Sequence, residues 1–283
     1  MYQAHSVTEL RQYVQHWNEH GQSIAFIPTM GNLHAGHMSL ISKGQSLCDR
    51  SLCSIFVNPM QFGANEDFNH YPRTLDDDLA KLAASGCDLV YLPTASELYP
   101  EGLDRISQVQ VTDLTDHYEG AHRPGHFTGV ATVVLKLFNI VKPDVSVFGK
   151  KDYQQYRVIS KMVADLNLDV QIIGQETTRE TSGLATSSRN QYLDEEQTRK
   201  AAMIYQTLRD SAEQISAGER DYLEMERRAL TRLQDAGFET EYFTICSAET
   251  LLPASREDRD LVILVTAGLG TTRLLDNIEI SLW

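Results

Sequence analysis

The chain has 283 residues, of which 42% are hydrophobic and 23% charged, and it carries a formal net charge of −14 at pH 7. This length is enough to bury a full core in one large domain or in two smaller ones. The acidic balance argues against a general affinity for nucleic acid, because such binding depends on neutralising phosphates.

Cysteine usage and apolar runs indicate the cellular setting. The four cysteines show no C-x-x-C spacing, so we expect neither a disulfide framework nor a zinc site. The first residues are polar and helical in period, unlike the apolar stretch of a signal peptide. No apolar run is long enough to span a bilayer. We expect a soluble, cytoplasmic protein that binds neither nucleic acid nor a membrane.

Short apolar runs alternate with helical patterns in the first part of the chain. The expected strands cover residues 23–28, 51–57, 87–93, 145–149 and 168–173. The expected helices cover residues 38–47, 74–86, 127–142 and 153–167. Such alternation predicts an α/β fold with a doubly wound parallel sheet. Ligands of these sheets bind beyond the carboxyl ends of the strands, at a topological switch point.

The pattern changes from about Glu180. Two long polar helices are expected over residues 194–218 and 220–237, each closed by a glycine suited to a C-cap. Strands follow over 240–250 and 260–280, so we expect a smaller α+β domain with a boundary near residue 177. "GLGTTR", from Gly268, is an incomplete dinucleotide-binding pattern and is interpreted as a turn.

The stretch "IPTMGNLHAGHMSLI" places His34 and His37 around Gly36, between an expected strand and an expected helix. A helix beginning after Asn32 presents free N–H groups and a partial positive charge, which suit an anion. Gly36 lets a ligand approach closely, and the histidines can donate hydrogen bonds to phosphate oxygens. The alternative is that both histidines only cap the helix.

Two further loops carry donors suited to phosphate. "VFGKKDYQQYRVI" presents Lys150 and Lys151 after a strand, and "LATSSRNQYL" presents two serines followed by Arg189. Gln154 and Gln155 could supply amide hydrogen bonds to a hydroxylated substrate. The alternatives are a solvated lysine pair and an ordinary turn before a helix.

Other polar residues also follow expected strands. Asn58, Gln61 and Arg123 could line a pocket. The acidic run 76–78 could hold a divalent ion against a polyphosphate, or could serve as dipole partners in a first helical turn. Neither a Walker sequence nor G-x-G-x-x-G is present, and the strand-end donors together predict a site for a nucleotide polyphosphate.

Seven collinear stretches resemble the pantothenate synthetase (pantoate–β-alanine ligase) family over almost the whole chain. They are "IPTMGNLHAGHMSLI", "FVNPMQFG", "DFNHYPRTLDDDLAKL", "HRPGHFTGVATVVLKLFNIVKPD", "FGKKDYQQ", "GLATSSRNQYL" and "TRLLDNI". The resemblance implies a Rossmann-like domain over residues 1–176 that binds nucleotide and pantoate, and a C-terminal α+β lid domain over 177–283. It also implies a cytoplasmic homodimer that uses ATP and Mg²⁺.

The resemblance also implies site residues. The catalytic residues would be His34, His37, Lys151 and Arg189. ATP would be bound by Met30, Gly31, Asn32, Leu33, His34, Ala35, Gly36, His37, Gly149, Lys150, Lys151, Asp152, Thr178, Thr186, Ser187, Ser188 and Arg189. Pantoate and β-alanine would be held by Gln61, Gln155, Asn58 and Arg123, and magnesium by Asp77 and Asp78.

Some positions depart from the family pattern. Lys150 stands where the family usually has Glu, Thr186 where Met or Leu is common, and Thr178 where Val is frequent. Lys81 occupies a place where some relatives offer a metal ligand, which weakens the assignment of magnesium to the acidic run.

The reaction implied by the resemblance has two halves: pantoate attacks the α-phosphorus of ATP to form an acyl adenylate, and the amine of β-alanine then attacks that anhydride. The first alternative is a nucleotidylyltransferase that acts on a small phosphorylated substrate. The second is a non-catalytic nucleotide sensor. An aminoacyl-tRNA synthetase is disfavoured by the acidic balance and by the absence of an appended anticodon-binding region.

Overall fold

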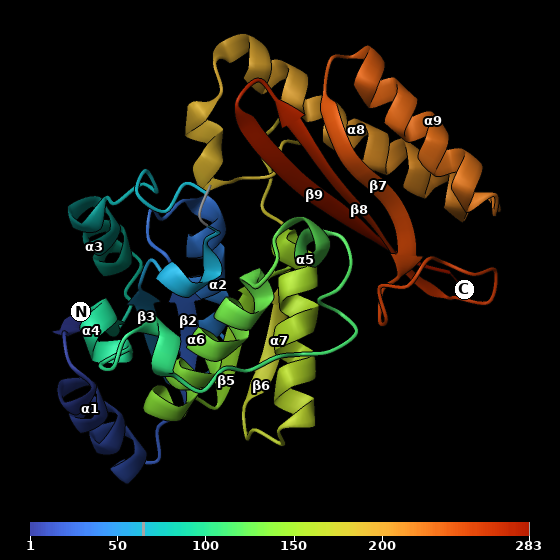
Figure 1. The fold of residues 1–283 in the computed structure, drawn as a ribbon. Coiled ribbons are helices and arrows are strands. Elements are labelled where there is room, and N and C mark those ends of the chain that lie inside the picture. The colour runs from blue at the N-terminus through green and yellow to red at the C-terminus, as the bar shows by residue number, and fades with distance from the viewer. Residues whose placement is uncertain (64–65, 283) are drawn as a thin grey trace. The chain divides into compact units, whose positions relative to one another are not determined.

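The computed structural model describes residues 1–63 and 66–282. The chain forms two compact units (Figure 1). Unit 1 comprises residues 1–150 and 155–176, and unit 2 comprises residues 151–154 together with the chain from Thr177 onward. The short segment 151–154 therefore belongs to unit 2, although strand and helix residues of unit 1 flank it in sequence.

Unit 1 is built on a six-stranded sheet in the order β1-β4-β3-β2-β5-β6, in which every neighbouring pair is parallel. The strands are β1 (Tyr2–Ala4), β2 (Ile24–Thr29), β3 (Arg50–Ile55), β4 (Leu89–Tyr91), β5 (Val145–Gly149) and β6 (Gln171–Gln175). The chain winds outward from β2 to β4 and then returns to place β5 on the other side of β2. This reversal makes a switch point between β2 and β5, so the predicted doubly wound sheet is confirmed. The edge strand β1 was not expected, because its three residues lack an apolar run.

Helices and single turns connect these strands. They are α1 (Val7–Glu19), α2 (Ala35–Gln45), α3 (Leu75–Ala84), α4 (Ala95–Leu98), α5 (Glu119–His122), α6 (His126–Val141), α7 (Tyr153–Asp165), η1 (Pro59–Gln61), η2 (Leu103–Arg105) and η3 (Lys150–Asp152). Within the described residues, no helix has both the length and the apolar character needed to cross a bilayer.

Alternate residues of the central strands point to opposite faces of the sheet. On one face, Ile41 of α2 and Leu82 of α3 join Ile27 of β2 in one buried apolar cluster. On the other face, the ring of Phe138 from α6 lies edge-on to those of Phe26 and Phe148, with ring centroids 6.3 and 6.4 Å apart. The central strands are buried on both faces, which explains why their sequences are continuous apolar runs.

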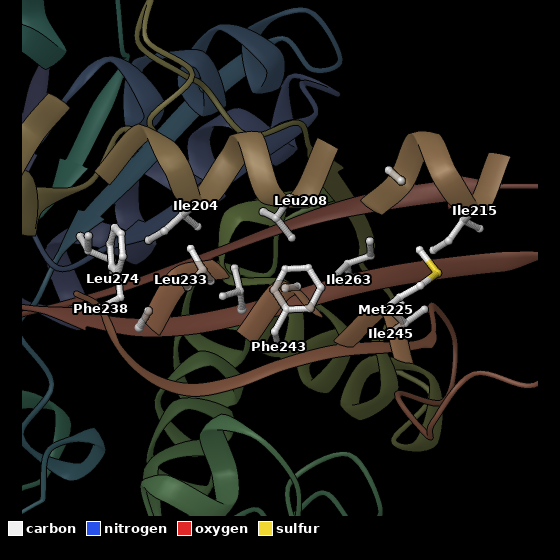
Figure 2. Close-up of a cluster of buried hydrophobic side chains, with 14 of the residues drawn as sticks. Ile204, Leu208, Ile215, Met225, Leu233, Phe238, Phe243, Ile245, Ile263 and Leu274 are labelled. Atoms are coloured by element: carbon white, nitrogen blue, oxygen red, sulfur yellow. The ribbon is translucent and has the colours of Figure 1, made fainter. Parts of the chain in front are cut away.

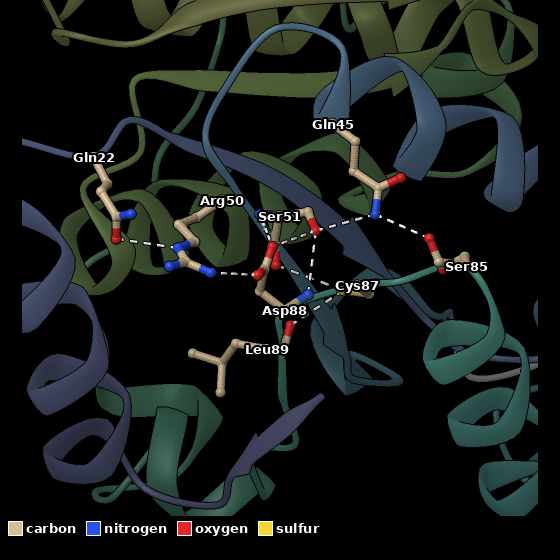
Figure 3. A network of polar contacts seen from close by, with 8 residues as sticks. All are labelled: Gln22, Gln45, Arg50, Ser51, Ser85, Cys87, Asp88 and Leu89. Atoms are coloured by element: carbon tan, nitrogen blue, oxygen red, sulfur yellow. Dashed lines mark hydrogen bonds and ion pairs between the residues drawn. The ribbon is translucent and has the colours of Figure 1, made fainter.

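A polar network ties together the amino ends of β3 and β4 (Figure 3). The carboxylate of Asp88 accepts hydrogen bonds from the Arg50 guanidinium at 2.8 Å and from the Ser51 N–H at 2.9 Å. Gln45, at the end of α2, donates to the Ser85 carbonyl at 3.0 Å. These contacts stabilise the amino ends of the strands. The ligand is expected at the opposite end of the sheet, beyond the carboxyl ends of the strands.

Unit 2 contains an antiparallel sheet in the order β7-β8-β9 and two long helices. Its elements are η4 (Ser188–Tyr192), α8 (Glu195–Ser216), α9 (Tyr222–Asp235), β7 (Glu239–Ser247), β8 (Asp260–Leu269) and β9 (Thr272–Ser281). Ile204 and Leu208 of α8 pack with strand residues such as Phe243 and Ile263 in one apolar cluster (Figure 2). The predicted α+β architecture of the C-terminal region is confirmed.

Glycines end the long helices and form the hairpin of unit 2. Gly218 and Gly237 follow α8 and α9 with φ of +107° and +81°, as the sequence predicts for C-caps. The hairpin between β8 and β9 pairs Leu269 with Thr272, and Gly270 adopts φ +61° in the turn. "GLGTTR" is therefore a turn and not a dinucleotide-binding loop.

Candidate active site

The loop that carries the two histidines follows β2, one of the two strands at the switch point. Gly31 has φ +83° and Asn32 has φ +48°, so the chain reverses through two left-handed residues. Asp78 of α3, 1% exposed, accepts the N–H groups of Asn32 and Leu33 at 2.8 and 2.7 Å. Lys81 donates to the Leu33 carbonyl at 2.8 Å. One carboxylate and one ammonium from α3 thus hold the turn in place.

The histidines themselves form a reciprocal cap at the start of α2. Nδ1 of His34 accepts the Gly36 N–H at 3.2 Å, and Nδ1 of His37 accepts the His34 N–H at 3.3 Å. The two rings lie with centroids 4.1 Å apart. Because both Nδ1 atoms accept, a neutral ring carries its hydrogen on Nε2, which is then a donor. Helix capping and phosphate binding are therefore compatible roles for the same side chains.

Gln61 contacts the histidine loop through Met30, and Asn58 donates a hydrogen bond to the Gln61 side chain. Gln61 donates to the Met30 sulfur at 3.1 Å, and its side-chain carbonyl accepts from Asn58 Nδ2 at 3.2 Å. Asn58, 1% exposed, also donates to the Gly129 carbonyl at 3.2 Å and accepts from the Tyr99 hydroxyl at 2.7 Å. These bonds occupy both the nitrogen and the oxygen of the Asn58 side-chain amide, so the geometry supports a role for Asn58 in orienting Gln61. Burial raises the pKa of Tyr99, which keeps its hydroxyl a donor.

Arg123 and His126 hold the backbone of Gln61. Arg123 forms an ion pair with Glu66, with an Nε–Oε1 distance of 2.8 Å, and also donates to the Gln61 carbonyl at 3.3 Å. His126 Nδ1 lies 2.8 Å from that same carbonyl. Burial, reinforced by the Arg123 charge, lowers the pKa of His126 from 6.5 to about 4, so the ring is neutral and donates to the carbonyl. The Arg123 pair in turn lowers the pKa of Glu66 against the opposing effect of burial.

The loop after β5 leaves the second strand of the switch point. Gly149 is the last residue of β5, and Lys150 opens η3. Lys150 forms an ion pair with Glu176, with an Nζ–Oε1 distance of 2.8 Å. Gln155 is half-buried on α7. The carboxyl ends of β2 and β5 therefore present the histidine loop and Gly149, which the sequence analysis assigns to the ATP site.

Unit 2 brings the other predicted donors together. A small, partly open hollow is lined by Lys151, Ser187 and Arg189, with Arg273 and Asp276 from β9. The Ser187 hydroxyl accepts the Arg189 N–H at 3.3 Å, which starts η4.

The remaining predicted residues of unit 2 are close in sequence, or by hydrogen bond, to residues that line this hollow. The Thr186 N–H donates to the Thr178 carbonyl at 2.9 Å, so these two predicted ATP contacts are neighbours. Asp152 lies in η3 beside Lys151, with 3.6 Å between Lys151 Nζ and an Asp152 oxygen. Ser188 is the first residue of η4.

The predicted magnesium ligands are not arranged as a metal cage. In the described part of the chain, no three His, Cys, Asp or Glu side chains are grouped closely enough to hold a metal ion. Asp78 is buried and holds the histidine turn, whereas Asp77 is exposed on α3. The geometry supports a structural role for Asp78, and the magnesium assignment of both residues stays a prediction.

Sequence patterns gave no role to several residues that shape the site. Tyr99 lies outside every motif, so the sequence offered no signal for it. His126 stands three residues after Arg123 in the stretch "HRPGHFTGVATVVLKLFNIVKPD", and its position just before an expected helix is a usable signal. Asp276 and Asn277 lie in the matching segment "TRLLDNI", but as strand residues they were given no role.

A doubly wound sheet with a histidine turn at its switch point, and a hollow of unit 2 lined by lysine, serine and arginine, fit an α/β enzyme that acts on a phosphate-bearing ligand. Residues 3–279 match the family described as pantoate-beta-alanine ligase. The chain belongs to the pantoate–β-alanine ligase family.

Named relatives agree with this assignment. The chain is 50% identical over 277 residues to the pantothenate synthetase of Marinobacter nauticus and 51% identical over 278 residues to that of Hahella chejuensis, each match covering 98% of both chains. A crystal structure of pantothenate synthetase from Thermus thermophilus matches with a TM-score of 0.93 at 41% identity, over 99% of this chain and 100% of that one.

A structure with ligands also matches. The ligase from Francisella tularensis, complexed with beta-gamma ATP and β-alanine, has a TM-score of 0.82 at 32% identity, over 98% of this chain and 97% of that one. The protein is therefore an enzyme of the ligase class. These relatives give no support to a nucleotidylyltransferase.

Proposed function

We propose that this protein condenses (R)-pantoate with β-alanine to pantothenate through a pantoyl adenylate, releasing pyrophosphate and AMP. The observation that carries the proposal is the family match over residues 3–279. The beta-gamma ATP and β-alanine of the Francisella structure support the choice of substrates.

Adenylation solves a chemical difficulty of amide formation. A carboxylate is a poor acyl donor because hydroxide is a poor leaving group. In the first half-reaction a pantoate oxygen forms a bond to the α-phosphorus of ATP while the bond to pyrophosphate breaks. In the second, the β-alanine nitrogen attacks the acyl carbon, AMP leaves, and the amine loses a proton. The protein's contribution is alignment and stabilisation of developing charge.

Unit 1 supplies histidine donors to the first step. The Nε2–H groups of His34 and His37 would donate to phosphate oxygens as negative charge develops. Met30 to His37 would lie along the nucleotide, and Gly36 would permit the close approach of a phosphate. The reciprocal cap supports this proposal, because it sets both rings in the tautomer that the role requires.

Unit 2 supplies the cationic donors. Lys151 and Arg189 would neutralise the charge of the departing pyrophosphate, and Ser187 and Ser188 would donate to its oxygens. Their shared hollow, lined by Lys151, Ser187 and Arg189, supports a common ligand. Other contacts of ATP are proposed for Gly149, Lys150, Asp152, Thr178 and Thr186.

Pantoate would be held by the amides of Gln61 and Gln155. Gln61 would also border the β-alanine position. Asn58 and Arg123 would act at this pocket chiefly through Gln61, because their polar groups already bond to it and to their neighbours. Removing Gln61 should therefore weaken pantoate binding more than ATP binding.

Magnesium is proposed to enter with ATP. Mg²⁺ keeps several waters and needs only one or two carboxylates beside the phosphates. Asp77 and Asp78 are the residues that the family resemblance suggests. The described residues provide no cage for the ion, and no step of the reaction above is assigned to it.

The family resemblance also suggests a cytoplasmic homodimer. Sedimentation velocity across a dilution series would test the dimer. A species of monomeric mass at all micromolar concentrations would contradict it.

A pyrophosphate-release assay tests the reaction. Enzyme, ATP and Mg²⁺ are mixed first with pantoate and then with β-alanine. Pantoate alone should release about one pyrophosphate per active site, and β-alanine should then allow continuous turnover. Pyrophosphate release that requires β-alanine from the start would contradict a separate adenylate.

A further inference from the structure

The segment "TRLLDNI", residues 272–278, matches the family but contributes no residue to the proposed reaction. It forms most of the edge strand β9 of unit 2. Within it Asp276 and Asn277 are 6% and 5% exposed, which is unusual for side chains of this polarity. Two adjacent buried polar residues on an edge strand need partners, and the partners they have suggest a function.

Asp276 is held by Arg179, which lies on the loop after β6. The two guanidinium nitrogens Nη1 and Nη2 donate to the two carboxylate oxygens at 2.6 and 3.0 Å, a bidentate pair. The guanidinium also lies 3.8 Å from the centroid of the Tyr205 ring. This pair is therefore fixed from several directions.

The same pair fixes the backbone of Asn277 on both sides. Asp276 Oδ1 accepts the Asn277 N–H at 2.8 Å, and Arg179 Nη2 donates to the Asn277 carbonyl at 3.1 Å. These bonds hold the N–H and the carbonyl of Asn277. With both backbone groups held, the direction of the Asn277 side chain is set by the strand.

The Asn277 side chain reaches the Lys151 loop. Its Nδ2 donates to the Lys151 carbonyl at 2.8 Å. Lys151 lines the hollow that also contains Ser187 and Arg189. Fixing the carbonyl of a residue fixes the orientation of its peptide plane, and so limits the directions in which its side chain can leave the backbone.

We propose that Asn277 is a positioning residue for Lys151, holding the Lys151 carbonyl so that Lys151 keeps its place in the hollow that it lines with Ser187 and Arg189. The Arg179–Asp276 pair holds the Asn277 backbone and so orients the Asn277 side chain toward the Lys151 carbonyl. This inference rests on the proposed role of Lys151 in pyrophosphate departure. It gives the C-terminal motif a place in the reaction through Asn277, which does not itself line the hollow.

A double-mutant cycle tests the proposal in the full-length enzyme. The four proteins are wild type, Asn277→Ala, Lys151→Met and the double variant, and pantoate-dependent pyrophosphate release is measured in each. Asn277→Ala should lower kcat between about tenfold and a hundredfold, because small misplacements of reacting groups have effects of this size. It should leave the Kd for pantoate, measured by calorimetry, within about twofold. In the Lys151→Met background, Asn277→Ala should cause no further loss.

Controls separate positioning from loss of folding. Thr207→Val removes another part-buried hydrogen bond of unit 2, from the Thr207 hydroxyl to the Met203 carbonyl at 2.8 Å, and should keep wild-type kcat. Asn277→Asp has nearly the same size but presents oxygen to the Lys151 carbonyl, so it should lose at least as much activity as Asn277→Ala. Thermal unfolding by circular dichroism checks that each variant is folded at the assay temperature.

The outcomes distinguish this inference from the proposed function. If Lys151→Met is nearly inactive while Asn277→Ala is as active as wild type, Asn277 has no positioning role but the function stands. Losses that multiply in the double variant would also overturn the inference. If Lys151→Met retains wild-type activity, the proposed role of Lys151 fails and the inference fails with it. Unfolding of both Asn277 variants would assign Asn277 to the fold alone.

Discussion

The Nδ1 atoms of His34 and His37 both accept backbone N–H groups at the start of α2. This capping sets each neutral ring as an Nε2–H donor without requiring a positive charge. Asp78 contributes at the same scale, because one buried carboxylate holds two successive N–H groups of the turn. Single side chains thus determine both the shape of the histidine loop and the chemistry that it can offer to a phosphate.

Removing His37 should slow adenylation. His37→Ala loses one donor to the transition state, and by analogy with oxyanion donors we expect a loss of about 3 kcal/mol, or about a hundredfold in pyrophosphate release. His16→Ala, at an exposed position on α1, serves as the matched control and should retain wild-type activity. A His37→Ala rate within a few-fold of wild type would exclude His37 from the mechanism.

His126 should make stability depend on pH. Its pKa is lowered from 6.5 to about 4 in the folded protein, so the unfolded chain binds more protons between these values. The contribution of neutral His126 to the free energy of unfolding is present above pH 6.5 and is lost as the pH falls toward 4. Between pH 7 and 5 the free energy of unfolding should fall by about 2 kcal/mol for this reason.

Urea unfolding at several pH values measures this dependence. His126→Gln should show a smaller fall in the free energy of unfolding between pH 7 and 5, whereas His16→Gln should follow wild type. Glu66, whose lowered pKa starts from 4.5, acts at lower pH and does not obscure this window. Equal slopes for wild type and His126→Gln would refute the assignment.

At the scale of elements, the contact between η1 and α6 places Gln61. Gly129 lies in α6 where the backbone of Met60 and Gln61 crosses it, and the Gly129 carbonyl accepts a hydrogen bond from Asn58. A Cβ atom at Gly129 would lie 2.4 Å from the Met60 oxygen. A helix and a single 3₁₀ turn thus approach so closely that only glycine fits between them.

Gly129→Ala should therefore displace η1 and with it Gln61. We expect a loss of stability of about 1–3 kcal/mol from overpacking, together with a higher KM for pantoate. Gly268→Ala is a suitable control, because its Cβ would make ordinary contacts of 3.5 Å or more. Steady-state kinetics and chemical denaturation measure the two effects, and an unchanged KM for pantoate would show that η1 does not hold this substrate.

At the scale of the whole molecule, the predicted donors are divided between two compact units. The histidine loop and Gln61 belong to unit 1, whereas Lys151, Ser187 and Arg189 belong to unit 2. The proposed reaction assigns a role to each of the two sets, and the adenylate must be protected from water. Ligand binding should consequently change the dynamics of unit 2 as well as those of unit 1.

Hydrogen exchange tests this expectation. ATP and pantoate together, without β-alanine, should slow amide exchange in residues 151–154 and 186–192 of wild type. Arg189→Ala should show weaker protection of the same segments, because the ligand loses a contact with unit 2. Exchange in unit 2 that does not respond to ligands would argue against the proposed role of unit 2 in ligand binding.

Local sequence determined much of the fold and part of the site. Apolar runs specified five of the six strands of unit 1, helix-ending glycines at 218 and 237 specified where the long helices stop, and the histidine turn was recognisable from adjacent residues alone. These features depend on short-range physics: strand burial, left-handed backbone conformations and helix caps.

Only the tertiary structure decided which distant residues support these local features. Asp78 meets the histidine turn across 45 residues and Asn277 meets Lys151 across 126. His126 meets the Gln61 carbonyl across 65. A carboxylate or amide has the same local signature whether it binds a metal, a substrate or a backbone N–H, because its hydrogen-bonding capacity is the same in each case. Its partner, and therefore its role, is selected by the packing of elements that no local pattern brings together.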